Sequence, residues 1–244
     1  MYIKICGLTK LDQAQAIAKM GVDALGFICV SSSPRYISAT AIGKIISSLL
    51  SAQSEIARSS ELDLIGVFLN ASMRELCETV ALAGLNAVQL HGDESPEFCD
   101  QLRSQLSTTN SKIKLIKALR VKDRAGLEQA HLFSNVVDAV LLDAYDPRMA
   151  GGTGKTLDWQ MLRDFRPACD WWLAGGLSPE NVATAIALVA PNGLDISSGV
   201  ERSAGDKDLT KVKRFLQECK ITNVPRTKVL SPRFIAGLEC KANA

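Results

Sequence analysis

The stretch LDLIGVFLNASMRELCETVALAGLNAVQLHG, residues 62–92, contains a strand, a helix and a second strand in one continuous pattern. Its two ends are short aliphatic runs, which are typical of buried strands. Between them, Ser72 and Glu75 have the form of a capping box, and Gly84 suits the left-handed position after a helix. One helix face is apolar, with Met73, Leu76, Cys77 and Val80. The stretch therefore predicts a strand–helix–strand unit.

The same alternation recurs along the chain. Eight strand candidates follow one another at intervals of mostly ~22 to 39 residues, the size of a βαβ unit. They are YIKICG (2–7), ALGFICV (24–30), LDLIGVFL (62–69), AVQLHG (87–92), KLIKAL (114–119), AVLLDA (139–144), WWLAGG (171–176) and GLDISSG (193–199). Strict alternation of strands and helices predicts a parallel sheet covered by helices, either a closed barrel or an open doubly wound sheet. Eight units within about 220 residues favour the closed (β/α)8 TIM barrel.

Local signals place several helix ends. Thr9 with Asp12 has the form of a second capping box. The triplets Ser-Pro-Glu at 95–97 and 178–180 each predict a helix start, because proline is tolerated at the first helical position. The last predicted helix runs from Asp208 to about Lys220. No Gly-x-Gly-x-x-Gly follows the first strand, so the sequence lacks the fingerprint of an open dinucleotide-binding fold.

Composition excludes several classes of protein. The chain has 244 residues, of which 47% are hydrophobic and 22% charged, enough apolar material for a sizeable core. Lys plus Arg (28) against Asp plus Glu (26) leaves a net charge of +2, so we expect no nucleic-acid partner. No apolar run has the ~18 residues of a membrane span, and residues 1–6 lack a signal-peptide charge pattern. We therefore expect a cytoplasmic monomer with no membrane association.

Cysteine usage and a glycine-rich segment narrow the chemistry further. The seven cysteines are scattered without a Cys-x-x-Cys pair, so neither a disulfide framework nor a metal site is predicted. GGTGKT at 151–156 ends like a P-loop, but Met149 stands where that motif needs its first glycine. We interpret the segment as a mobile lid over the barrel mouth, with an ordinary flexible loop as the alternative. The expected organisation is one barrel domain, 1–220, and a flexible extension, 221–244.

In a parallel barrel the active site forms at the C-terminal ends of the strands. The residues at these positions include a thiol, a carboxylate, an imidazole and a guanidinium: Cys6, Arg35, Gln89, His91, Asp143, Gly175, Gly176, Ser197, Ser198 and Gly199. The turns 174–178 and 197–199 follow the seventh and eighth strands, the usual place of a barrel phosphate site. The alternative is that their glycines only permit tight turns. Together these positions predict a small, phosphorylated substrate.

The first strand places a charged residue inside the predicted barrel. Period-two alternation puts Lys4 and Cys6 on one face, and Asp195 on the eighth strand is a candidate partner for the buried ammonium. Lys4 would lower the pKa of the Cys6 thiol unless Asp195 neutralises it. Asp143, which ends an apolar strand, suits a general acid. The alternatives are an inert buried cysteine and a loop-capping aspartate.

Seven motifs, in this order, resemble the phosphoribosylanthranilate isomerase family of tryptophan biosynthesis. They are KICGLT (4–9), SPRYI (33–37), VQLHGDE (88–94), LLDA (141–144), GGTGKTLDW (151–159), LAGGLSPENV (173–182) and LDISSGVE (194–201). The resemblance covers residues 2 to about 218. The stretch 51–62 and the extension after Lys220 depart from the compact family pattern, but neither contains a site residue.

The resemblance implies an Amadori rearrangement of N-(5-phosphoribosyl)anthranilate to 1-(2-carboxyphenylamino)-1-deoxyribulose 5-phosphate, without cofactor or metal. By motif position, Cys6 matches the family's general base and Asp143 its general acid. Gly175, Gly176, Ser198 and Gly199 would hold the phosphate, together with Ser197 of the same turn. Arg35 would bind the anthranilate carboxylate, because its planar fork suits a bidentate pair.

Two other interpretations remain open from the residues alone. A related barrel enzyme, such as indole-glycerol-phosphate synthase or a bifunctional sugar-phosphate isomerase, would need a lysine or paired aspartates where this chain has Cys6 and Asp143. A non-catalytic phosphate-binding barrel would keep the glycine turns without needing an acid and a base. Turnover of substrate by the purified chain discriminates among the three.

Overall fold

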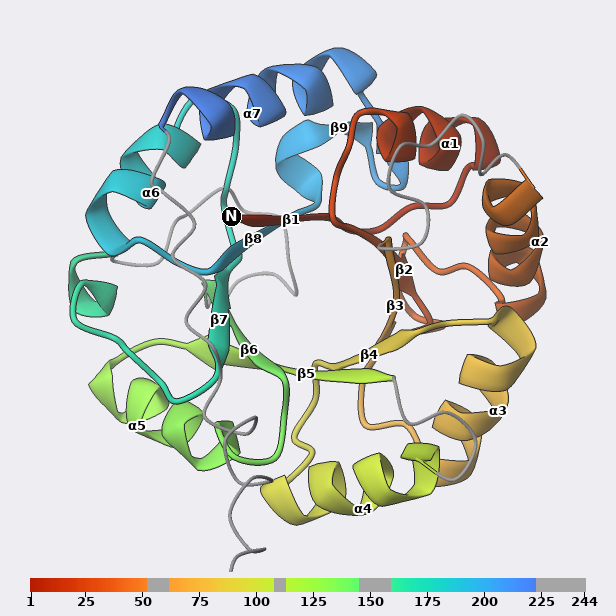
Figure 1. Ribbon diagram of the computed structural model, residues 1–244, viewed down its shortest axis with the longest axis horizontal. Coiled ribbons are helices and arrows are strands. Elements are labelled where there is room, and N and C mark those ends of the chain that lie inside the picture. Colours follow the sequence, from red (N-terminus) through yellow and green to blue (C-terminus); the bar gives the residue numbers. More distant parts are fainter. Residues whose placement is uncertain (52–61, 108–112, 145–158, 223–244) are drawn as a thin grey trace, which may run out of the picture.

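Eight parallel strands close into a barrel at the centre of the molecule (Figure 1). The computed structural model describes residues 1–51, 62–107, 113–144 and 159–222. Each strand pairs with the next along the chain, and β8 returns to pair with β1. The strands are β1 (Tyr2–Ile5), β2 (Ala24–Ile28), β3 (Asp63–Phe68), β4 (Ala87–Leu90), β5 (Lys114–Val121), β6 (Ala139–Ala144), β7 (Asp170–Leu173) and β8 (Gly193–Ile196). The eight predicted strands and the (β/α)8 barrel are confirmed.

Helices surround the barrel in the described part of the chain (Figure 1). They are α1 (Leu11–Lys19), α2 (Ala39–Ser51), α3 (Met73–Ala83), α4 (Pro96–Ser107), α5 (Arg124–Phe133), α6 (Val182–Val189) and α7 (Leu209–Ile221). Between β6 and β7 the described residues form only a short 3-10 helix, η3 (Trp159–Leu162). The predicted lid at 151–156 and residues 223–244 of the expected extension lie outside the described residues. None of the described helices is long and apolar enough to cross a membrane.

The helix ends agree with some of the capping signals and correct others. At α3 the Ser72 hydroxyl accepts the N–H of Glu75 at 3.2 Å, as predicted. The prediction for Thr9 is wrong, because its hydroxyl donates to the carbonyl of Gly205 at 2.7 Å and α1 begins at Leu11 without a side-chain cap. The second capping signal is therefore used for a tertiary contact.

The two Ser-Pro-Glu triplets behave differently. The triplet 95–97 starts α4 at Pro96, as predicted. The triplet 178–180 precedes its helix, because α6 begins only at Val182. Asn181 explains the delay: its side chain accepts the N–H of Ser178 and donates to the carbonyl of Gly176, both at 2.8 Å. These bonds fasten the turn that follows β7.

The connection after β8 contains a small antiparallel hairpin that the sequence analysis did not predict. A short 3-10 helix, η4 (Ser198–Val200), leads into β9 (Glu201–Ser203), which pairs with β10 (Asp206–Lys207). α7 then begins after Asp208, whose carboxylate accepts the N–H groups of Thr210 and Lys211. The hairpin brings two buried charged groups beside the strand ends.

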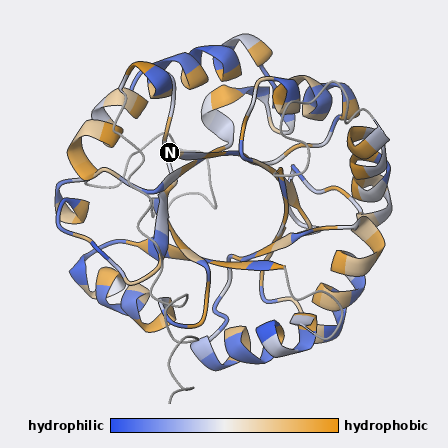
Figure 2. Ribbon diagram, in the orientation of Figure 1, coloured by the Kyte–Doolittle hydropathy of each residue, from blue (hydrophilic) through white to orange (hydrophobic). Residues whose placement is uncertain are grey.

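The core has two layers. The larger lies between the strands and the helices, and Figure 2 shows hydrophobic and hydrophilic residues alternating along those helices. The smaller fills the barrel itself, where period-two alternation directs every second strand residue inward. It contains Ala24, Ile65, Ala87, Ile116, Ala118, Ala139, Leu141, Trp172 and Ala174. At its N-terminal end Tyr2 stacks on Trp172 with ring centroids 4.5 Å apart. A packed interior leaves the C-terminal end of the barrel as the place for chemistry.

Candidate active site

Most of the candidate residues lie where the inward-facing strand positions reach the C-terminal end of the barrel. Cys6 directly follows β1 and Asp143 is in β6, with the same inward alternation as Leu141 below it. Gln89 and His91 occupy successive inward positions at the end of β4. The predicted meeting of these side chains at one end of the barrel follows from parallel pairing around the closed sheet.

Lys4 is the centre of the polar cluster, with no exposed surface at all. Its Nζ donates to Gln89 Oε1 at 2.6 Å, to Asp195 Oδ2 at 3.1 Å and to Cys6 Sγ at 3.3 Å. The predicted Lys4–Asp195 pair is therefore present. Burial by itself lowers the pKa of Lys4, but the Asp195 carboxylate and the Cys6 sulfur outweigh it, so the net pKa is raised. Lys4 is thus a charged donor held inside the barrel.

Cys6 is buried beside this ammonium. Burial raises the pKa of the Cys6 thiol, and Asp195 raises it further, whereas Lys4 and Lys207 lower it. Burial is the largest of these effects, so the net direction is upward, and the two ammonium groups do not bring the pKa of Cys6 below its usual range. A Cβ at Gly26 would lie 2.7 Å from Cys6 Sγ and 2.8 Å from Lys4 Cε, so only glycine leaves room for both side chains.

A second set of contacts leads from Lys4 to Asp143. Gln89 Nε2 lies 3.4 Å from His91 Nδ1, and His91 Nε2 lies 3.3 Å from Asp143 Oδ2. Gln89 is fully buried, while His91 and Asp143 are half-buried at the mouth. The candidate base and the candidate acid are thereby linked through three intervening polar side chains.

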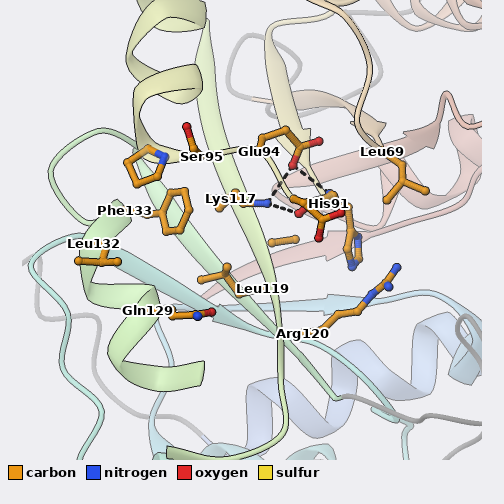
Figure 3. A pocket seen from close by; sticks show the side chains of 14 residues that line it. Leu69, His91, Glu94, Ser95, Lys117, Leu119, Arg120, Gln129, Leu132 and Phe133 are labelled. Carbon is orange, nitrogen blue, oxygen red and sulfur yellow. Dashed lines mark hydrogen bonds and ion pairs between the residues drawn. The ribbon is translucent and has the colours of Figure 1, made fainter. Parts of the chain in front are cut away.

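A pocket of about 420 Å³ opens beside His91, between the β4–α4 connection and α5 (Figure 3). Its floor holds a buried ion pair, Lys117 Nζ to Glu94 Oε2 at 2.9 Å. Arg120 also borders it, and Figure 3 shows this side chain reaching toward His91. Arg120 is the register partner of Asp143 on the neighbouring strand. Arg120 was not predicted from the sequence, although its position at the end of the fifth strand could have identified it.

Arg35 has a partner that the sequence analysis did not foresee. Its Nη2 donates to Glu201 Oε2 at 2.7 Å, and its Nε to both carboxylate oxygens at 3.0 and 3.1 Å. Lys207 Nζ donates to Glu201 Oε1 at 2.7 Å and to Ser197 Oγ at 3.3 Å. Burial by itself raises the pKa of Glu201, but Arg35 and Lys207 outweigh it and hold it below its usual range. Glu201 had no signal stronger than its place in the motif LDISSGVE, and Lys207 lies outside all of the motifs quoted above.

The glycine turn after β8 contacts this cluster through Ser197, which accepts from Lys207. Gly175 and Gly176 have φ of 81° and 66°, a region that other residues rarely adopt. Ser197, Ser198 and Gly199 follow β8, where η4 begins. Consecutive backbone N–H groups in such turns are suited to an anion. Among the described residues, no group of three or more His, Cys, Asp or Glu side chains is arranged to hold a metal ion.

The fold and its polar mouth place the chain among the (β/α)8-barrel enzymes. A sequence model described as N-(5′-phosphoribosyl)anthranilate (PRA) isomerase matches residues 3–218. The chain belongs to this family.

Individual relatives agree with that assignment. A Trichormus variabilis protein named N-(5′-phosphoribosyl)anthranilate isomerase is 51% identical over 212 residues, 87% of this chain and 95% of the relative. The phosphoribosyl anthranilate isomerase of Thermotoga maritima has a solved structure that is 36% identical, with a TM-score of 0.76, covering 90% of this chain and 98% of the other. Another solved isomerase, in complex with reduced 1-(o-carboxyphenylamino)-1-deoxyribulose 5-phosphate, is 33% identical with a TM-score of 0.73 and the same coverage.

Proposed function

We propose that Cys6 and Asp143 are the base and the acid of the isomerase reaction that this chain catalyses. The chain is an N-(5′-phosphoribosyl)anthranilate isomerase of tryptophan biosynthesis, which converts a phosphorylated small molecule by an Amadori rearrangement. Cys6 and Asp143 come from strands on different sides of the barrel, and one set of polar contacts joins them. This observation carries the residue assignment.

The reaction needs two proton transfers at the barrel mouth. Asp143 gives a proton to the furanose ring oxygen as the C–O bond breaks, and the lone pair of the anthranilate nitrogen forms the Schiff base. The Cys6 thiolate then removes the proton from the adjacent carbon, and the electron pair returns toward nitrogen to give the enolamine. Asp143 has then given one proton to the substrate oxygen and Cys6 has taken another from the substrate carbon, so the substrate has gained and lost one proton each. Lys4, held by Asp195, supports the thiolate by donating to its sulfur.

The phosphate of the substrate is proposed to occupy the turns after β7 and β8. Gly175, Gly176, Ser197, Ser198 and Gly199 offer backbone N–H groups and hydroxyls. The family relative solved with a phosphorylated product analogue supports a site for such a molecule in this fold. Gly176→Asp should raise KM by on the order of tenfold or more, because the side chain adds bulk and a like charge. An unchanged KM, together with no competition by inorganic phosphate, would place the phosphate elsewhere.

Arg35 is proposed to bind the anthranilate carboxylate, while Gln89 and His91 line the substrate at the mouth. Two nitrogens of Arg35 bond Glu201, which leaves Nη1 for a ligand. Arg120 is a second candidate, since within the described ranges its guanidinium makes no hydrogen bond or ion pair. The variants Arg35→Lys and Arg120→Lys discriminate the two candidates, because only the variant of the carboxylate-binding residue should raise KM.

We place the enzyme in the cytoplasm, without nucleic-acid or membrane partners, and analytical ultracentrifugation checks the predicted monomer.

The direct test is the decay of phosphoribosylanthranilate fluorescence, with the labile substrate generated in situ and the purified chain added. Asp143→Asn should lose most activity and the alkaline limb of the kcat/KM profile, because an amide cannot donate a comparable proton. Circular dichroism of the variant controls for folding. If Asp143→Asn keeps the turnover and both limbs of the wild-type enzyme, Asp143 is not the acid.

A further inference from the structure

Gln89 and His91 stand between the proposed base and acid, yet the mechanism above gives neither a part in proton transfer. Lys4 Nζ donates to Gln89 Oε1 at 2.6 Å, and Gln89 Nε2 lies 3.4 Å from His91 Nδ1. His91 Nε2 lies 3.3 Å from Asp143 Oδ2. The contacts form one polar chain that begins beside Cys6 and ends at Asp143.

The direction of this chain is set at its buried end. An ammonium has three N–H donors and no acceptor, and all three donors of Lys4 are used, on Cys6, Gln89 and Asp195. The Gln89 atom that faces Lys4 must therefore be the amide oxygen. The NH2 group of Gln89, which can only donate, is then the group that faces His91.

The same logic continues through the imidazole. An N–H donor from Gln89 requires an unprotonated, accepting Nδ1 on His91. The neutral ring then carries its proton on Nε2, the nitrogen that faces Asp143. A proton on Nδ1 would set two donors against each other beside a fully buried amide, so the contact with Gln89 requires the accepting Nδ1.

We propose that Lys4 and Gln89 hold His91 as its neutral Nε2–H tautomer, and that His91 thereby positions Asp143 as a proton donor. His91 presents its N–H to Oδ2 and leaves Oδ1 of Asp143 to carry the acid proton. His91 and Gln89 are positioning residues in this proposal, which rests on the proposed role of Asp143.

The charge state of His91 matters to the reaction. A neutral N–H interacts weakly with the protonated acid and more strongly with the carboxylate that forms as the proton leaves, so it stabilises the transition state selectively. An imidazolium would instead hold Asp143 ionised before the substrate arrives. Among the described residues, charged or titratable groups toward the same mouth include Arg120 from β5, Lys4 from β1 and Asp195 from β8, with Cys6 after β1 and Lys207 from β10.

The first test reads the tautomer directly. The chain has two histidines, so the ¹⁵N ring signals of selectively labelled protein are assigned with His131→Asn. We expect His91 to be protonated at Nε2 and unprotonated at Nδ1 at pH 7. A proton on Nδ1, in either the neutral or the charged ring, would overturn the proposal without any activity measurement.

The second test changes the direction of the chain. In Gln89→Glu a carboxylate faces Nδ1, so His91 should become doubly protonated. The alkaline limb of kcat/KM should then move to lower pH. Gln89→Met is the uncharged control. His91→Leu should lower kcat by on the order of 10- to 100-fold, a larger factor than any rise in KM, while His91→Gln, which retains an N–H near Nε2, restores part of kcat. A doubly protonated His91 with an unmoved alkaline limb overturns the proposed coupling to Asp143.

The two proposals fail in distinguishable ways. Full activity in Asp143→Asn would contradict the acid assignment and leave the ¹⁵N result for His91 unaffected. Loss of activity in Asp143→Asn, combined with a proton on Nδ1 of wild-type His91, would keep the acid and overturn only its proposed positioning.

Discussion

Two lysines are buried to nearly the same degree in different layers of the molecule, 0% exposed for Lys4 and 1% for Lys117. Lys4 faces the inside of the barrel and bonds Gln89 on β4, Asp195 on β8 and Cys6 directly after β1. Lys117 faces the helices, where its Nζ donates to Gly92 O at 2.6 Å and to Glu94 Oε2 at 2.9 Å, with the Phe133 ring 5.7 Å away. One lysine joins distant strands at the active site, and the other fastens a single loop.

The comparison shows that burial of a charge does not by itself identify a functional residue. Each lysine has a buried carboxylate partner, and each lies near a buried thiol, Cys6 for Lys4 and Cys99 for Lys117. Burial raises the pKa of Cys99 to about 11, and burial raises that of Cys6 as well. What separates the regions is access to the barrel mouth.

The thiols should give the largest difference in turnover. Cys6→Ser is expected to lower turnover by at least about 100-fold while the fold persists, because serine is a far weaker base. Cys99→Ser, the matched control in the outer layer, should turn over substrate like the wild type. Equal activity of the two variants in the fluorescence assay would remove the thiolate from the mechanism.

The lysines should differ in both activity and stability. Lys4→Met leaves Asp195 without its partner, and Asp195 Oδ1 already has none among the described residues, so we expect a loss of about 3–5 kcal/mol in the free energy of unfolding. Lys117→Met should cost less, because Glu94 keeps the N–H groups of Asn70 and Gly92. Urea unfolding measures both losses. Turnover should fall in Lys4→Met alone, and a similar fall in Lys117→Met would break the comparison.

The carboxylates should give the smallest effect, a shift in thiol reactivity. Asp195 raises the pKa of Cys6, so the thiolate forms only at higher pH. Asp195→Asn should therefore lower that pKa and move the acid limb of kcat/KM to lower pH. Glu94→Gln should likewise lower the pKa of Cys99, with no change in the activity profile. The pH dependence of iodoacetamide alkylation, followed by peptide mass spectrometry, reads both thiols in one digest. An acid limb that stays in place in Asp195→Asn would contradict the electrostatic explanation.

Much of the barrel could be predicted because its signals are local. Aliphatic runs mark the strands, and Ser72 and Gly84 bound their helix through bonds and angles within a few residues. The failures came where another hydrogen bond, distant for Thr9 and local for Asn181, took the place of the expected helix start. Thr9 bonds Gly205 instead of capping α1, and Asn181 holds the turn after β7 in place of an earlier start to α6.

In the candidate site, too, the residues with local signals could be predicted and most contacts between distant residues could not. Alternation along the first strand predicts that Lys4 and Cys6 share the inner face, and strand ends predict Asp143 and the glycine turns at the mouth. The engagement of Arg35 by Glu201, 166 positions later, had no local pattern from which it could be predicted. The hairpin β9–β10 that carries Glu201 and Lys207 was missed because its strands are only three and two residues long.

The sequence by itself determined which residues lie on the inner face of each strand, since side-chain alternation is a property of the extended backbone. It also determined that a thiol, an imidazole and a carboxylate end three of those strands. Only the tertiary structure decided which contacts form: Lys4 reaches the expected Asp195 across 191 positions, and it also reaches Gln89 across 85, a contact that no pattern predicted. Closure of the barrel creates those contacts, because pairing β8 with β1 brings the two ends of the chain's strand order together, and no local pattern encodes that distance.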